Sequence, residues 1–177
     1  MPHWIEPHPQ GIYIRPADAW IDPSLPADRA LITHGHADHA RGGHAKVWAT
    51  PETLAIMSLR YGPQQGVPVA YGESMRLGGV DISFVPAGHV LGSAQIVLDH
   101  AGERVVVSED YKRRADPTCA CFQPVPCDIF VTEATFGRPS SVTPNARARS
   151  IGCWRCSTRR PIAACWWAPM RWARRSG

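Results

Sequence analysis

The hydrophobic and polar positions along the chain predict many short strands. The alternation from Val80 to Val85 is typical of a half-buried strand. Other apolar, β-prone runs predict strands over residues 11–14, 19–22, 29–33, 46–49, 94–98, 104–107 and 128–132, with one or two more in the Gly- and Pro-rich stretch 62–79. Because strands greatly outnumber helices, we expect a sandwich of two sheets with helices on the outside.

One helix is predicted clearly. Thr50 is its N-cap, Pro51 occupies the first helical position, and the helix extends to about Arg60. Its core-facing candidates are Leu54, Ile56, Met57 and Leu59. At 177 residues and 44% hydrophobic content, the chain is large enough to bury one core.

Four side chains that can bind a metal stand within six residues, directly after the apolar stretch 29–33. They are His34, His36, Asp38 and His39, in the pattern HxHxDH. In an extended chain His34 and His36 point to the same side, and Gly35 permits a turn that aims the later pair elsewhere. This layout suits two neighbouring cations, and imidazoles with a carboxylate but no thiolate are typical of catalytic zinc, manganese or iron. The alternative is a surface loop that is merely rich in histidine.

Three later strand ends carry further candidates. His89 stands in a glycine-rich loop after the alternating strand and would add a third imidazole. Asp110 follows a later strand, where its carboxylate can bridge two cations or serve as an ordinary turn residue. Glu133 ends the last predicted strand. Because an acid there is costly unless it has a partner, we expect Glu133 to orient a metal ligand without binding the metal.

The HxHxDH motif resembles that of the metallo-β-lactamase superfamily of metal-dependent hydrolases. The segments AGHVLGSAQ (87–95), SEDYK (108–112) and TEATFG (132–137) are similar to those of its nuclease branch with a β-CASP insert, and most of all to bacterial ligase-associated DNA exonucleases. The resemblance runs from about Gly11 to Gly137. It implies an α/β fold, the αββα sandwich of the superfamily, of which this chain carries only the N-terminal half.

The resemblance also implies a role for each candidate. Two divalent metal ions, Zn²⁺ or Mn²⁺, would be held by His34, His36 and His89 on one side and by Asp38 and His39 on the other, with Asp110 as bridge. Asp38 and Asp110 would be the catalytic carboxylates, and activated water would attack a phosphodiester of nucleic acid, DNA in preference to RNA. Asp22 would brace the metal-binding loop, although an ordinary Asp-Pro turn explains it equally well. A DNA ligase and a helicase, in DNA repair, are the functional associates that this family implies.

The sequence departs from the family pattern in two places, and both are expected to lower activity. Glu109 stands where the family has glycine, beside Asp110, and no histidine follows His100. A small-molecule hydrolase of the same superfamily, such as a thioesterase resembling glyoxalase II, is the runner-up function, and AGHVLGSAQ followed by TEATFG argues against it. An inactive metal-binding fragment of a nuclease is the third reading.

The net charge of +4 conceals a sharp asymmetry. Residues 138–177 contain nine arginines and no acidic residue, so ten basic and fifteen acidic side chains remain for the first 137 residues. A basic, tryptophan-rich tail is one form of nucleic-acid arm. The CxxC at Cys153 and Cys156 lacks a partner pair, and we interpret it as accidental.

We instead interpret this tail as out of frame. Back-translated and read from the third base of the Cys165 codon, the segment 165–173 is compatible with LVGAYALG, a run associated with the C-terminal half of the ligase-associated exonucleases. We therefore divide the chain into a partial metallo-β-lactamase domain at 1–137 and an aberrant tail at 138–177, which we expect to pack poorly.

The N-terminal segment and the cysteines indicate where in the cell the protein is expected. No basic segment followed by an apolar run begins the chain, and no stretch is long enough to span a membrane. We therefore expect a cytoplasmic protein without membrane contact, whose six cysteines are free thiols.

Overall fold

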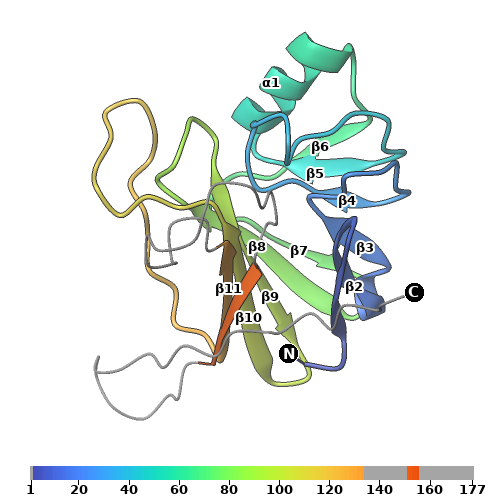
Figure 1. Cartoon of the computed structure of the whole chain (residues 1–177), viewed down its shortest axis with the longest axis vertical. Coiled ribbons are helices and arrows are strands. Elements are labelled where there is room, and N and C mark those ends of the chain that lie inside the picture. The colour runs from blue at the N-terminus through green and yellow to red at the C-terminus, as the bar shows by residue number, and fades with distance from the viewer. Residues whose placement is uncertain (1, 134–150, 156–177) are drawn as a thin grey trace, which may run out of the picture.

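The computed structural model of the chain describes residues 2–133 and, for strand pairing alone, residues 151–155. Its strands form two sheets of six that face each other, as Figure 1 shows. The first sheet has the order β1-β2-β3-β4-β5-β6 and the second has the order β12-β11-β10-β9-β8-β7. The sandwich of two sheets that the sequence predicted is confirmed.

The first sheet is built from the N-terminal third of the chain. Its strands are β1 (Ile5–His8), β2 (Gly11–Ile14), β3 (Ala19–Ile21), β4 (Ala30–Leu31), β5 (Val47–Ala49) and β6 (Gly66–Pro68), with a 3₁₀ turn η1 at Arg15–Ala17. The pairs β1·β2 and β2·β3 are antiparallel, and the pairs from β3 to β6 are parallel. Strand β1 was not predicted, because Pro7 interrupts its pattern; a proline is tolerated there because β1 is an edge strand.

The helix α1 (Pro51–Tyr61) joins β5 to β6 and lies on the outside of the first sheet, as Figure 1 shows. Thr50 caps it by accepting a hydrogen bond from the Thr53 N–H, and Pro51 occupies its first turn, as predicted. Met57 is fully buried in a small cluster with Ile32 and Val47 beneath the helix. Leu59 is 89% exposed, so its predicted core-facing position is wrong. No helix in the described part of the chain is long and apolar enough to cross a membrane.

The second sheet follows from residue 74 onward. Its strands are β7 (Ser74–Leu77), β8 (Val80–Pro86), β9 (Ala94–His100), β10 (Glu103–Glu109), β11 (Ile129–Glu133) and β12 (Ile151–Arg155). Pairing is antiparallel from β7 to β10, parallel between β10 and β11, and antiparallel between β11 and β12. The sequence predicted no strand after residue 132, so β12 is a correction to the expected tail. It pairs along the edge that β11 would otherwise leave open. The rest of the predicted tail lies outside the described residues.

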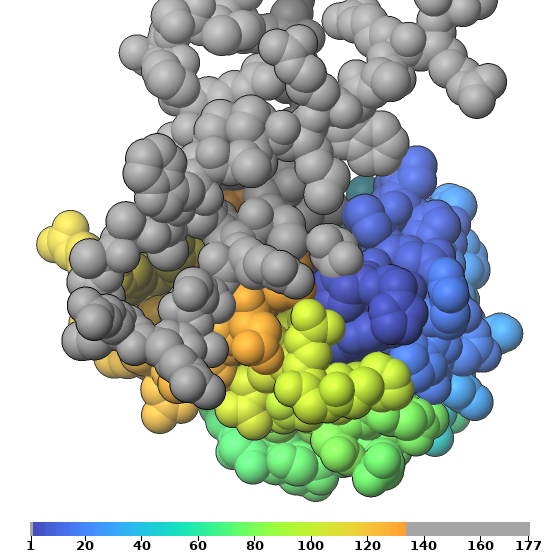
Figure 2. Space-filling view, turned by 90° about the horizontal axis from the view of Figure 1, so that it is seen from below, coloured from blue at the N-terminus to red at the C-terminus, as the bar shows by residue number. Residues whose placement is uncertain are grey.

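The main core fills the space between the two sheets. Large side chains from both sheets are fully buried there, among them Ile12, Ile14 and Ile21 of the first sheet and Ile82, Phe84 and Leu98 of the second. The N-terminal segment closes the lower end, where Trp4 Nε1 donates a hydrogen bond to Glu103 Oε2 over 3.1 Å. Figure 2 shows this dark blue segment beside the yellow-green region around residue 100. The core therefore fixes how the strand ends of one sheet face those of the other.

Candidate metal centre

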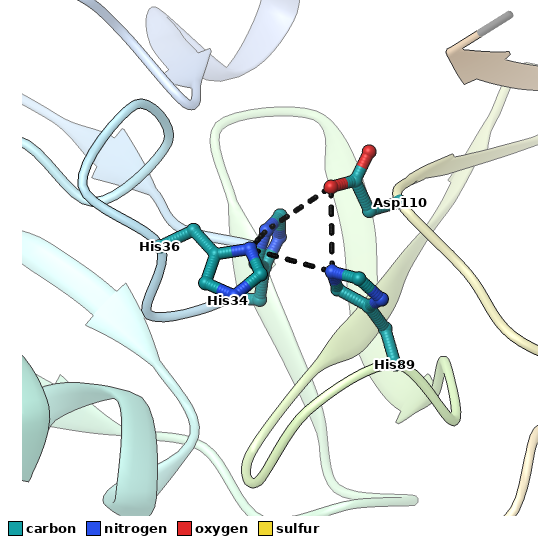
Figure 3. Close-up of side chains that lie close together, drawn as sticks. All are labelled: His34, His36, His89 and Asp110. Atoms are coloured by element: carbon teal, nitrogen blue, oxygen red, sulfur yellow. Dashed lines mark hydrogen bonds and ion pairs between the residues drawn. The ribbon is translucent and has the colours of Figure 1, made fainter. Parts of the chain in front are cut away.

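Four side chains converge at the ends of strands from both sheets. His34 and His36 follow β4 of the first sheet, whereas His89 follows β8 and Asp110 follows β10 of the second. Figure 3 shows the three imidazoles and the carboxylate pointing toward one another. His34 Nε2 lies 3.1 Å from His36 Nδ1, which lies 3.3 Å from His89 Nε2. Asp110 Oδ2 lies 3.4 Å from His89 Nε2 and 3.6 Å from His34 Nε2.

These separations suit a tetrahedral cation. Ligand atoms that surround an ion at about 2.0–2.1 Å in tetrahedral geometry lie roughly 3.3 Å from one another. The four measured separations range from 3.1 to 3.6 Å. Three nitrogens and one carboxylate oxygen are also the donor set that zinc prefers when no thiolate is present. The residues present therefore fit a divalent metal.

The lowered pKa values of two imidazoles also favour metal binding. Burial, with the positive charge of His39 as a smaller cause, lowers the pKa of His34 to about 3. Burial also lowers the pKa of His89, although Asp110 opposes the shift. Both rings are therefore neutral at neutral pH, which is the form that binds a metal.

A buried hydrogen-bond network fixes which ring nitrogen faces the cluster. Asp22 Oδ1 accepts from the Thr33 N–H over 2.8 Å, and Asp22 Oδ2 accepts from the Thr33 hydroxyl. Because that hydroxyl has given its only hydrogen to Asp22, it accepts from His34 Nδ1, 3.0 Å away. His34 Nε2 is then left with its lone pair toward the other ligands. Sequence reasoning missed Thr33, because its role depends on Asp22 lying beside it in the fold.

Asp22 acts on His39 directly. Its Oδ2 atom lies 2.8 Å from His39 Nδ1, and both residues are buried. Burial is the largest single influence on each pKa and opposes the charged form, but the mutual hydrogen bond and the electrostatic attraction of the surrounding charges together outweigh it. The pKa of Asp22 is therefore lowered and that of His39 is raised. Asp22 also has a φ of 46°, a left-handed conformation that aspartate tolerates better than most residues. These contacts are the ones expected of a residue that braces the loop, and this role of Asp22 stays a prediction.

Asp22, His34 and His39 form a second group of potential ligands within 4.8 Å of one another. Asp110 lies between the two groups, because its Oδ2 atom is also 3.9 Å from His39 Nε2. A carboxylate that faces imidazoles of both groups has the position expected of a bridge. The bridging role itself stays a prediction.

The other two predicted site residues lie differently. Asp38 is exposed and belongs to neither group of potential ligands among the described residues. The role of Asp38 as a ligand therefore stays a prediction. Glu133 is half-buried at the end of β11, close enough for its negative charge to raise the pKa of His89 against the effect of burial.

Glu109 occupies a backbone position that favours glycine. Its φ is 49°, and the register of β10 against β11 shifts between Val107 and Glu109, which marks a bulge. A side chain in this left-handed conformation costs roughly 1–2 kcal/mol relative to glycine. The glycine that the resemblance places here therefore has a conformational reason, and Glu109 departs from it directly beside Asp110.

Two curated proteins, among others, have sequences similar to that of this chain. No protein-family model matches the chain. A probable DNA ligase from Opitutus terrae is 31% identical over 146 residues, which cover 80% of this chain and 14% of that protein. Ribonuclease TTHA0252 from Thermus thermophilus is 30% identical over 142 residues, which cover 62% of this chain and 32% of the ribonuclease. This chain therefore spans less than a third of the length of either relative.

Among solved structures, a motif mutant of a Cronobacter sakazakii metallo-β-lactamase aligns with a TM-score of 0.43 and 20% sequence identity. The alignment covers 64% of this chain and 57% of that one.

Proposed function

The chain belongs to the metallo-β-lactamase superfamily, in its β-CASP nuclease branch, and from that membership we propose that its metal cluster serves to hydrolyse phosphodiester bonds of nucleic acids. One observation carries the proposal. His34, His36, His89 and Asp110, from two sheets and three separate loops, bring four ligand atoms to separations of 3.1 to 3.6 Å. A surface loop that is merely rich in histidine gives no reason for such convergence.

The proposed ligand set is the one that the family resemblance implies, and the geometry supports its first metal site. His34, His36 and His89 hold one divalent ion, Zn²⁺ or Mn²⁺, and His39 with Asp38 holds a second. Asp110 lies between them. Divalent ions at such sites activate water and stabilise negative charge in the transition state. Asp22 and Thr33 keep the ring nitrogens of His34 and His39 correctly oriented, because their hydrogen bonds take up the opposite nitrogens.

The substrate is the finer part of the proposal. One curated relative is a probable DNA ligase and the other a ribonuclease, so the two relatives point to different nucleic acids. We favour a DNA exonuclease that acts in DNA repair with a ligase and a helicase in the cytoplasm, because the segments AGHVLGSAQ, SEDYK and TEATFG resemble the ligase-associated family most. A thioesterase is the alternative for the same cluster.

We further propose that this chain is weakly active or inactive. Glu109 stands beside Asp110 where the family resemblance places glycine, and residues 101–177 contain no histidine that could supply a further ligand. This favours the reading of the chain as a metal-binding part of a nuclease, with an out-of-frame tail at residues 138–177.

A substrate panel tests the proposal. The purified chain, loaded with Zn²⁺ or Mn²⁺, is assayed on end-labelled single- and double-stranded DNA, on RNA and on a thioester. We expect weak cleavage of DNA that is lost in the variant His34→Ala plus His36→Ala and retained in the control His3→Ala plus His8→Ala. Thioester hydrolysis without nuclease activity would contradict the proposal. A chain inactive on every substrate supports the inactive-fragment reading if it still binds metal.

A further inference from the structure

The first turn of α1 holds the loop that carries His89. The hydroxyl groups of Thr50 and Thr53 lie 2.7 and 3.1 Å from the carbonyl oxygen of Gly92 and donate to it. All of these atoms belong to buried residues. Gly92 has a φ of 76°, and a Cβ atom there would come within 2.8 Å of Thr50 Oγ1 and of Glu52 Cβ. The helix and the loop are therefore in closer contact than any other residue at position 92 would allow.

Ser93 extends this contact to His89. Its Oγ atom accepts hydrogen bonds from the backbone N–H groups of His89 and Val90, over 3.0 and 3.2 Å. Ser93 is buried and directly follows Gly92. Gly92, whose carbonyl group accepts the hydrogen bonds from α1, is therefore next in the chain to Ser93, whose hydroxyl group binds the His89 backbone.

The other end of α1 contacts the HxHxDH loop. Arg60 Nη2 donates a hydrogen bond to the carbonyl oxygen of Gly35 over 3.0 Å. The side chain of Ile56 lies against the same residue, since a Cβ atom at Gly35 would be 2.9 Å from Ile56 Cδ1. Gly35 stands between His34 and His36. One helix therefore contacts the two ligand loops, and these loops extend from different sheets.

We propose that α1 is a positioning element for the metal centre, which acts through Thr53 on the His89 loop and through Arg60 on the loop of His34 and His36. This inference rests on the proposed metal centre, but not on the choice of substrate. A rigid helix that touches both loops sets the separation of the imidazoles that they carry, which is 3.3 Å between His36 Nδ1 and His89 Nε2. Thr53 and Arg60 are positioning residues, since they contact backbone carbonyl groups of the ligand loops.

Metal affinity tests the positioning role. The variant Thr53→Val keeps the shape of the side chain and removes the hydroxyl, Thr53→Ser keeps the hydroxyl, and Ser58→Ala is a control at an exposed position of the same helix. In a Co²⁺ titration we expect Thr53→Val to lose about tenfold in affinity, Thr53→Ser to restore it, and Ser58→Ala to stay within twofold of the unchanged protein. The visible spectrum of the Co²⁺ complex of Thr53→Val should shift toward that of His89→Ala.

Amide hydrogen exchange of the metal-free protein gives a second readout that needs no metal. We expect exchange over residues 87–93 to be at least tenfold faster in Thr53→Val, and exchange over residues 33–37 to be faster in Arg60→Met. Unchanged exchange together with unchanged Co²⁺ affinity in Thr53→Val would overturn the inference. Absence of Co²⁺ binding by the unchanged protein would instead contradict the proposed metal centre, while the exchange rates still decide whether α1 holds the loops.

Discussion

Asp22 Oδ2 and His39 Nδ1 form a hydrogen bond of 2.8 Å in which both side chains are only 5% exposed. Buried charges are costly unless they are paired, and here the pair also orients a potential metal ligand. The same carboxylate reaches His34 through the hydroxyl of Thr33. One buried residue therefore controls the orientation of two imidazoles.

The first prediction concerns this pair. In Asp22→Asn the amide NH₂ group cannot accept from His39 Nδ1, so we expect metal affinity to fall by about 10- to 100-fold. Isothermal titration with Zn²⁺ measures the change. The control is Asp81→Asn, at an exposed position of β8, which should leave affinity within twofold. Equal affinities for the two variants would show that Asp22 does not orient the ligands.

The second prediction concerns stability and metal. Because a ligand that binds only the folded state stabilises it by mass action, free Zn²⁺ at about 100 times its dissociation constant should add roughly 2.7 kcal/mol to the free energy of unfolding. Urea denaturation with and without a chelator measures this difference. The variant His34→Ala plus His36→Ala should show no such difference. A metal effect that persists in this variant would place the binding elsewhere.

The third prediction concerns Glu109. Glycine adopts a φ of 49° without penalty, whereas alanine keeps the Cβ atom that makes this conformation costly. We expect Glu109→Gly to be more stable than Glu109→Ala by about 1 kcal/mol, as measured by urea denaturation. Both variants lose the carboxylate, so the comparison isolates the backbone. If alanine equals glycine, the left-handed conformation does not explain the glycine of the family.

The fourth prediction concerns the reading frame. Sequencing the gene across codons 130 to 180 should reveal that a single-base shift restores LVGAYALG in place of residues 165–173. The intact mass of the expressed chain provides the matching protein measurement. An uninterrupted frame that ends at Gly177 in independently sequenced copies would refute the interpretation.

The fifth prediction concerns nucleic-acid affinity. Arg113 and Arg114 are exposed and follow Asp110 by three and four residues. If the cluster acts on nucleic acid, Arg113→Ala plus Arg114→Ala should weaken binding of single-stranded DNA at low salt. The slope of the logarithm of the binding constant against the logarithm of the salt concentration should become shallower by about 1.4. Fluorescence anisotropy in the presence of a chelator measures binding without cleavage. The charge-matched control is Arg76→Ala plus Arg15→Ala, on exposed residues that form ion pairs elsewhere.

The sequence predicted the strand ends better than the details of the site. The alternation from Val80 to Val85 is a local pattern of buried and exposed side chains, so the strand can be recognised from this short segment alone. The same reasoning placed His89 and Asp110 at strand ends, where the structure brings them together with His34 and His36. That these four residues bind a metal stays a prediction.

The errors have a common physical cause. Leu59 fits the apolar pattern of a helix, but only packing against the sheet decides that Met57 is buried and Leu59 is exposed. Thr33 acquired its role only from contact with Asp22, eleven residues away in the chain.

The distribution of the ligands over two sheets has a consequence for chain entropy. His34 and Asp110 are 76 residues apart, and a cross-link over that distance lowers the conformational entropy of the unfolded chain by the equivalent of about 4.5 kcal/mol. A cation held by these residues would therefore act as a reversible cross-link between the two sheets. Without the cation, the two sheets would still be joined by the apolar core between them and by α1, which contacts both ligand loops.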